Sequence, residues 1–130
     1  MKYVTLMYTD PEHTKAMSKP EFDAVMRKHT ELREELIASG ELIGGMGMAV
    51  ADETTLLRLG PDGVVAERGP LAAGAAIHIS AYYELECESD ERAREIAERL
   101  LDDHVTAVEL RSVHDSVELQ ETPEKVPRPG

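Results

Sequence analysis

The stretch IHISAYYELE, residues 77–86, decides the fold because apolar and polar residues alternate along it. Successive side chains of a β-strand point to opposite faces of the sheet. One face of this strand then carries Ile77, Ile79, Ala81, Tyr83 and Leu85, and the other carries His78, Ser80, Tyr82 and Glu84. We therefore predict a strand with an apolar side that packs under helices and a mixed side that helices leave uncovered.

Two segments have the three- and four-residue spacing of apolar side chains that is typical of amphipathic helices. The first follows a capping box formed by Ser18 and Glu21 and ends at Gly40, a residue suited to terminating a helix. The second begins after Ser89, which is predicted to be its N-cap. The segment between the first strand and Ser18 is predicted to be a connecting loop.

The remaining strands are predicted at 2–8, 41–50 and 105–113, with a hairpin of 54–59 and 64–67 around a Pro-Asp-Gly turn. Two helices with one apolar stripe each can cover only one face of a sheet. The order β–α–β, hairpin, β–α–β therefore predicts an α+β fold: a ferredoxin-like sandwich with an antiparallel sheet and two helices on one face. We predict one domain over residues 1–120 and a disordered, proline-rich tail over 121–130.

The composition limits the partners. The formal net charge is −12 and no basic patch is present, so nucleic acid and anionic membranes are not expected to bind. No run is long enough to span a membrane, and the opening MKYVTLMYTD does not resemble a signal peptide. Cys87 is the single cysteine, which excludes an internal disulfide. We expect a cytoplasmic protein with a small-molecule partner.

The uncovered face is predicted to carry a mixed set of side chains from three strands. We place Val4 and Leu6 of the first strand under the helices. The uncovered set is then Tyr3, Thr5 and Met7, with His78, Ser80, Tyr82, Glu84, Glu109 and Arg111. Aromatic residues among charged ones suit an amphipathic cavity between two subunits. A simple solvated face remains the equal alternative.

Several short motifs, in their order along the chain, resemble the YCII-related family, in the branch marked by a DGPF motif. They are MKYVTLMY (1–8), GGMGM (44–48), ETTLLRLGPDG (53–63), RGPLAA (68–73) and VELRSV (108–113). The resemblance covers about residues 1–113. It implies a dimeric α+β barrel, in which two four-stranded sheets face each other around a cavity. It also implies a His–Asp acid–base pair and lyase or isomerase chemistry on cyclic or enolisable substrates.

The chain departs from the family pattern at several polar positions. Met46 stands where the family usually has Glu, Arg68 replaces the Asp of the motif, and Leu71 replaces its Phe. Ala73 and Ala75 stand where Glu and Lys are usual. These departures leave two hypotheses open. One is a cofactor-independent enzyme acting on a cyclic, phenolic or polyketide-like substrate; the other is a non-catalytic ligand-binding or regulatory homodimeric barrel.

His78 is the first candidate for proton transfer, since an imidazole titrates near neutral pH. His29 on the first helix is the second, with Asp52 as its carboxylate partner, although a histidine satisfied at the edge of the core is the simpler interpretation. Arg111 could bind an anionic oxygen or pair with Glu84, and Tyr82 could donate to an oxyanion or only pack. The other expected lining residues are Tyr3, Thr5, Met7, Met46, Ser80, Glu84 and Glu109. The histidines lack metal-ligand spacing, so no metal or cofactor is expected.

Overall fold

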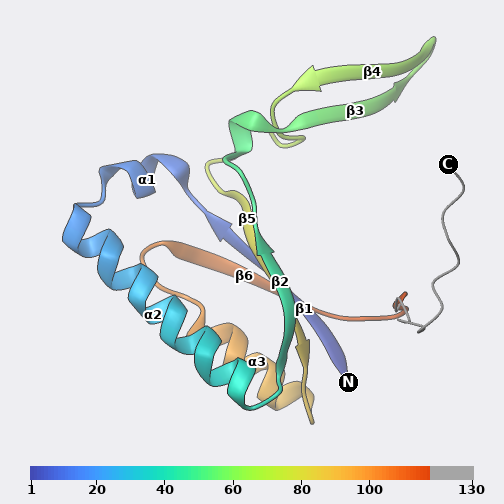
Figure 1. Cartoon of the computed structure of the whole chain (residues 1–130). Helices are drawn as coiled ribbons and strands as arrows, with labels where there is room; N and C mark the ends of the chain where they lie inside the picture. The colour runs from blue at the N-terminus through green and yellow to red at the C-terminus, as the bar shows by residue number, and fades with distance from the viewer. Residues whose placement is uncertain (118–130) are drawn as a thin grey trace, which may run out of the picture.

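The computed structural model describes residues 1–117 and contains a four-stranded antiparallel sheet in the order β2-β5-β1-β6. The strands are β1 (Lys2–Thr9), β2 (Leu42–Gly47), β5 (His78–Glu86) and β6 (Val105–Ser112). The helices α2 (Lys19–Ala38) and α3 (Asp90–Arg99) lie together on one side of this sheet (Figure 1). The arrangement is compatible with the predicted ferredoxin-like α+β fold.

The two long helices begin where the sequence predicts. The Ser18 side chain accepts a hydrogen bond from the backbone N–H of Glu21, and its hydroxyl donates to the Glu21 carboxylate. Ser89 accepts from the backbone N–H of Arg92 at the start of α3. These caps satisfy N–H groups that the helices themselves leave without partners. Gly40 has a φ of 79°, the left-handed conformation expected at the end of α2.

The predicted loop after β1 is wrong, because Pro11–Ala16 forms a short helix, α1. Asp10 caps it by accepting hydrogen bonds from the backbone N–H groups of Glu12 and His13. Pro11 stands in the first turn, where its missing N–H costs no helical hydrogen bond. An Asp-Pro pair is a helix-start signal. The helix that follows it here has only six residues and no apolar stripe, so the sequence pattern did not reveal it.

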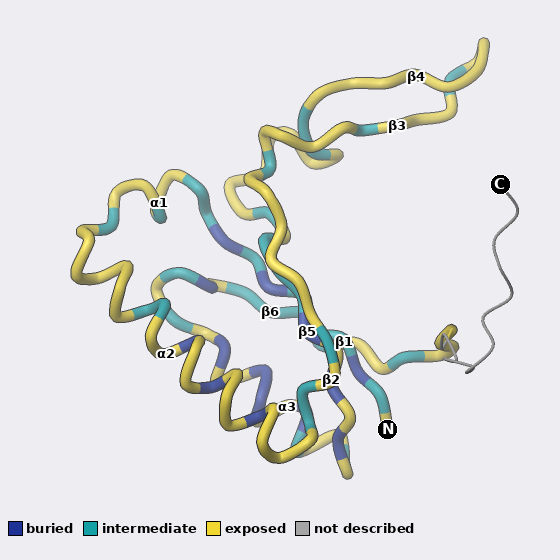
Figure 2. The backbone as a smooth tube through the Cα atoms, in the orientation of Figure 1, coloured by how far each residue is buried: buried dark blue, intermediate teal, exposed yellow. Residues whose placement is uncertain are grey.

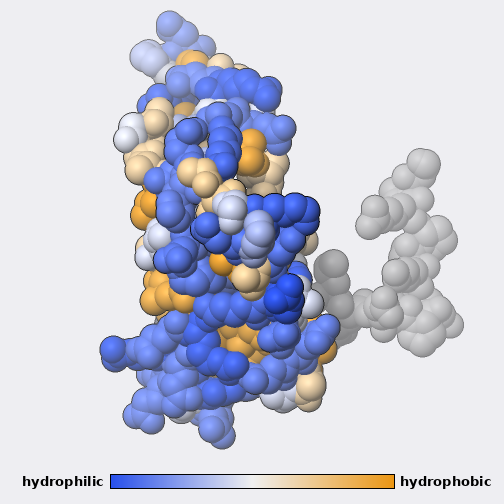
Figure 3. All heavy atoms as spheres, turned by 90° about the vertical axis from the view of Figure 1, so that its left-hand side faces the viewer, coloured by the Kyte–Doolittle hydropathy of each residue, from blue (hydrophilic) through white to orange (hydrophobic). Residues whose placement is uncertain are grey.

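The core lies between the helices and the sheet (Figure 2). Four core side chains are fully buried at 0% exposure: Leu36 of α2, Leu85 of β5, Ile96 of α3 and Leu100, which caps the end of α3. The outer surface of the helix layer is mostly hydrophilic, with small patches of hydrophobic residues (Figure 3). This is the one-sided burial expected of amphipathic helices on a sheet.

The predicted orientation of β1 is wrong. Tyr3, Thr5 and Met7 lie under the helices at 4%, 0% and 2% exposure, whereas Val4 and Leu6 lie on the open face. The strand carries apolar residues on both faces, so its sequence alone does not show which face is covered by the helices. Pairing decides the orientation: Tyr3 and Thr5 lie opposite Leu85 and Tyr83 of β5, which are on the helix side.

The alternation predicted for β5 also breaks, at a β-bulge. Met7 pairs with Ala81 but the next residue, Tyr8, pairs with Ile79, so Ser80 is an extra residue on β5. A bulge shifts the faces of all residues beyond it. Beyond the bulge, Ile79 pairs with Tyr8 and His78 pairs with Thr9.

The hairpin is confirmed as β3 (Thr55–Gly60) and β4 (Gly63–Arg68), which form a separate two-stranded sheet. It extends away from the helices and the main sheet (Figure 1), and most of its residues are exposed (Figure 2). Gly63 has a φ of 123°, a value that favours glycine in the turn. The hairpin contributes no residue to the core.

None of the helices within residues 1–117 is both long and apolar enough to cross a membrane. The predicted tail, 121–130, and the last residues of the predicted domain, 118–120, lie outside the described part of the chain.

Candidate functional site

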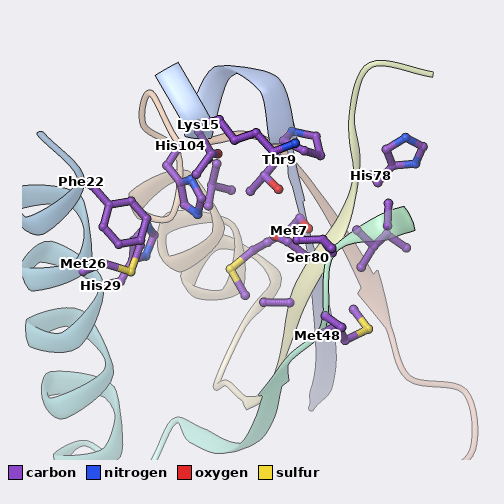
Figure 4. Close-up of a pocket in the computed structure, with 18 of the residues that line it drawn as sticks. Met7, Thr9, Lys15, Phe22, Met26, His29, Met48, His78, Ser80 and His104 are labelled. Carbon is purple, nitrogen blue, oxygen red and sulfur yellow. Dashed lines mark hydrogen bonds between the residues drawn. The ribbon is translucent and has the colours of Figure 1, made fainter. Parts of the chain in front are cut away.

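A cavity of about 430 Å³ opens between the first half of α2 and the upper end of the sheet (Figure 4). Its walls are mainly apolar and include Met7, Phe22, Met26, Met48, Val50 and Tyr83. The polar lining groups are Thr9, Thr14, Lys15, His29, Arg33, His78, Ser80 and His104. An apolar cavity with a few polar groups is the usual form of a small-molecule site.

His29 is the most buried titratable group of the cavity, at 8% exposure. Its Nε2 lies 2.9 Å from Oδ2 of Asp102, although the ring is not aligned for a linear hydrogen bond. Burial lowers the pKa of His29 below its ordinary value of 6.5, and the Asp102 carboxylate only partly offsets this effect. His29 is therefore a neutral imidazole at pH 7, able to accept a proton.

Asp102 is held from both sides. Its Oδ1 accepts hydrogen bonds of 2.7 Å from the backbone N–H groups of His104 and Val105. The Nζ of Lys28 lies 3.3 Å from its Oδ2. Burial alone would raise the pKa of Asp102, but these donors and His29 outweigh it and the pKa is lowered. Asp102 is thus an ionised carboxylate in a fixed position beside His29.

His104 lines the cavity close to Phe22 and His29 of α2 (Figure 4). Its Nδ1 lies 3.0 Å from the Thr14 hydroxyl of α1, and its ring meets Phe22 edge-on at 6.2 Å. Burial lowers its pKa as well, so both imidazoles favour the neutral form. α1, which was predicted to be a loop, therefore contributes Thr14 and Lys15 to the site.

His78 and Ser80 are the predicted candidates that reach this cavity through the bulge. Both are half-buried and line it. The Ser80 hydroxyl donates a 3.4 Å hydrogen bond to the carbonyl oxygen of Met7. Figure 4 shows His78 apart from His29 and His104, on the far side of β5. His78 is thus at the rim and not beside the buried carboxylate.

The other predicted polar residues lie on the opposite face of the sheet. Tyr82 pairs with Leu6, and Arg111 with Val4, which are both open-face residues. The sheet therefore separates Tyr82 and Arg111 from the cavity of the same chain, and the predicted set of His78, Tyr82 and Arg111 is not assembled within one subunit. Arg111 pairs with Glu109 at 3.3 Å, rather than with the predicted Glu84.

The remaining predicted residues are dispersed. Tyr3 and Thr5 belong to the core between helices and sheet, and only Met7 of the three β1 residues lines the cavity. Met46 is exposed on β2. Asp52 is exposed in a short 3₁₀ helix, η1 (Ala51–Glu53), so Asp102 and not Asp52 is the carboxylate at His29.

Asp102 and His104 are the functional candidates that sequence reasoning undervalued. They lie in the turn between α3 and β6, more than seventy residues from His29. The Asp-Asp-His sequence before a strand, residues 102–104, is a usable signal because an Asp side chain can bond the backbone two residues on. Its pairing with α2, however, depends on how that helix crosses the sheet.

No three side chains of His, Cys, Asp and Glu gather closely enough to hold a metal ion within residues 1–117. Comparison with protein-family models found no match, and no curated protein matches the sequence.

Proposed function

We propose that this chain is a cofactor-independent acid–base enzyme of small-molecule metabolism, with His29 as the base. The observation that supports it best is the buried, neutral His29 with the ionised Asp102 2.9 Å away, at the wall of an apolar cavity. A histidine with a pKa near or below neutrality and a carboxylate neighbour is a common general base.

The chemistry follows from the position of the carboxylate. Asp102 favours the tautomer of His29 that carries its proton on Nε2, which leaves the lone pair on Nδ1. Nδ1 would take a proton from a C–H next to a carbonyl, and the electron pair would form an enolate. The imidazolium would then return the proton to another carbon, giving isomerisation, or to a departing group, giving elimination.

The apolar walls support a cyclic, phenolic or polyketide-like substrate. Phe22, Met26 and Val50 offer flat and flexible apolar contacts that suit a ring. The resemblance to YCII-related proteins points to the same lyase or isomerase chemistry. It also points to a His–Asp pair, a role for which His29 and Asp102 are the candidates in this chain.

The chain is also proposed to work as a homodimer with the open faces of the two sheets packed together. Supporting this, Leu6, Tyr8 and Tyr82 on that face are only half-buried. Tyr82→Glu should shift sedimentation from dimer to monomer, because it places a charge in the packed face. A wild-type chain that sediments as a monomer at high concentration would contradict the dimer.

The enzyme is tested by deuterium incorporation into a panel of cyclic ketones in D₂O, measured by NMR at the carbon next to the carbonyl. His29→Gln should slow the exchange by about a hundredfold or more while ligand binding persists. His114→Gln is the matched control, because His114 is exposed after β6 and does not line the cavity.

The alternative is a non-catalytic ligand-binding barrel. It is favoured by the apolar residues at positions where the family has polar ones, and by the structural bonds that already occupy Oδ1 of Asp102. Binding of panel compounds without deuterium incorporation in the wild type would support this alternative and exclude the base role of His29.

A further inference from the structure

Arg33 lies one helical turn after His29 on α2 and lines two hollows of the surface. It lines the cavity with His29, and it lines a second groove of about 360 Å³ along β2. Residues four apart on a helix lie on the same side of it. Arg33 therefore lies on the side of α2 that carries the proposed base, and it lines both the cavity and the groove.

Arg33 has no carboxylate within ion-pair distance among residues 1–117. Its guanidinium donates a 3.4 Å hydrogen bond to the Thr30 hydroxyl of its own helix. In contrast, Arg92 and Arg99 each pair with a carboxylate from another element, Glu41 and Glu35. An unpaired cation at a cavity is notable in a chain with 26 acidic and 14 basic residues.

Tyr83 supplies a second polar group at the same junction. It is only 9% exposed, it lines both hollows, and its hydroxyl has no hydrogen-bond partner within the described chain. Burial raises the pKa of Tyr83 and the charge of Arg33 opposes this, which places the two groups in one electrostatic environment. The hydroxyl is therefore a protonated, unused donor.

Glycines of β2 keep this junction open. Gly45 pairs with Tyr83, and a Cβ at Gly45 would lie 2.7 Å from Cδ1 of the Tyr83 ring. A larger residue would displace the tyrosine ring or fill the groove beside it. The glycine thus preserves both the position of Tyr83 and the space next to Arg33.

We propose that Arg33 and the Tyr83 hydroxyl bind a carboxylate group of the ligand whose ring occupies the cavity beside His29. This rests on the proposed function and names its substrate class: cyclic or aromatic carboxylic acids. Arginine matches the two oxygens of a carboxylate with two parallel N–H donors, and a buried tyrosine adds a third donor. The protein as a whole repels anions, so a carboxylate ligand requires such a local cation.

The test compares benzoate with its neutral isostere benzamide by isothermal titration calorimetry on the full chain. Benzoate should bind the wild type, and Arg33→Gln should weaken it by about tenfold or more, as expected for a charge-assisted pair. Tyr83→Phe should weaken benzoate binding by about threefold to tenfold by removing one neutral donor. Benzamide binding should change little in either variant.

Arg27→Gln is the matched control, because Arg27 is an exposed residue of the same helix that lines neither hollow. Equal losses in Arg33→Gln and Arg27→Gln would overturn the proposal, since they would reflect net charge alone. Benzamide binding as tight as benzoate, or no saturable benzoate binding, would overturn it as well. Circular dichroism of each variant verifies folding. The base role of His29 is judged separately, by deuterium exchange, so the two proposals can fail independently.

Discussion

The two faces of the four-stranded sheet come from the same strands but differ in what covers them. On the helix face, alternate residues of β1 are at most 7% exposed, from Tyr3 to Thr9. On the open face, Val4, Leu6 and Tyr8 are only half-buried. The helix face therefore carries the stability of the single chain and the cavity, and the open face is available for a partner.

The largest expected effect is a core truncation on the helix face. Leu36→Ala should lower the free energy of unfolding by about 3 kcal/mol, because it opens a cavity at a fully buried site. Leu6→Ala on the open face should cost about 1 kcal/mol or less in dilute protein, because less apolar surface is buried there. Urea unfolding curves measure both. Equal losses in dilute protein would abolish the contrast, and a Leu6→Ala loss that grows with protein concentration would indicate a second copy on the open face.

The next effect concerns the ion pair that joins the start of β2 to α3. Arg92 donates to both oxygens of Glu41, at 2.7 Å and 2.9 Å, and these bonds lower the pKa of Glu41 to about 2. Glu41→Gln should cost about 1–2 kcal/mol at pH 7. Glu98→Gln, which breaks the exposed pair with Arg94, should cost less than about 0.5 kcal/mol.

The pH dependence gives this pair a second measurement. The folded-state pKa of Glu41 lies below its ordinary value of 4.5, so the stabilisation is complete above that value and is lost as pH falls toward about 2. The wild type and Glu41→Gln should therefore converge in stability in acid. A difference that persists unchanged at pH 2 would mean that the pair acts through packing rather than charge.

A smaller effect is expected from His29. Its pKa is lowered by burial, which disfavours the charged form, whereas the pKa of Glu41 is lowered by hydrogen bonds to its charged form. At His29 the unfolded chain therefore binds a proton below about pH 6.5 that the folded chain does not yet bind. The wild type should lose stability as pH falls below that value. His29→Gln should flatten this part of the profile. An unchanged profile in His29→Gln would mean that His29 titrates as a solvated side chain despite Asp102, Lys28 and His104 around it.

The smallest effect is expected on the open face. The Tyr8 hydroxyl donates to the Glu109 carboxylate, which Arg111 also contacts. Tyr8→Phe should change the unfolding free energy of dilute protein by about 0.5 kcal/mol, since the bond is partly solvated. A larger loss that appears only at high concentration would place this network inside an interface between copies.

Much of the fold was predictable because its signals are local. The caps at Ser18 and Ser89, the helix end at Gly40 and the turn at Gly63 depend on the chemistry of a few neighbouring residues. The site was predictable only in part. His29 and His78, both singled out from the sequence, line the cavity, but the carboxylate beside His29 was not predicted, and Tyr82 and Arg111 lie on the opposite face of the sheet.

The amino-acid pattern sufficed for the order of the strands and the two long helices, since period-two and helical alternation and turn residues act within a short stretch of chain. Tertiary pairing decided the rest. β1 is apolar on both sides, so only its register with β5 could set which residues face the helices. One extra residue at Ser80 shifted the pairing of Ile79 and His78 with β1, and the turn after α3 brought Asp102 to His29. Such contacts depend on three-dimensional register, which alternation along one strand does not contain.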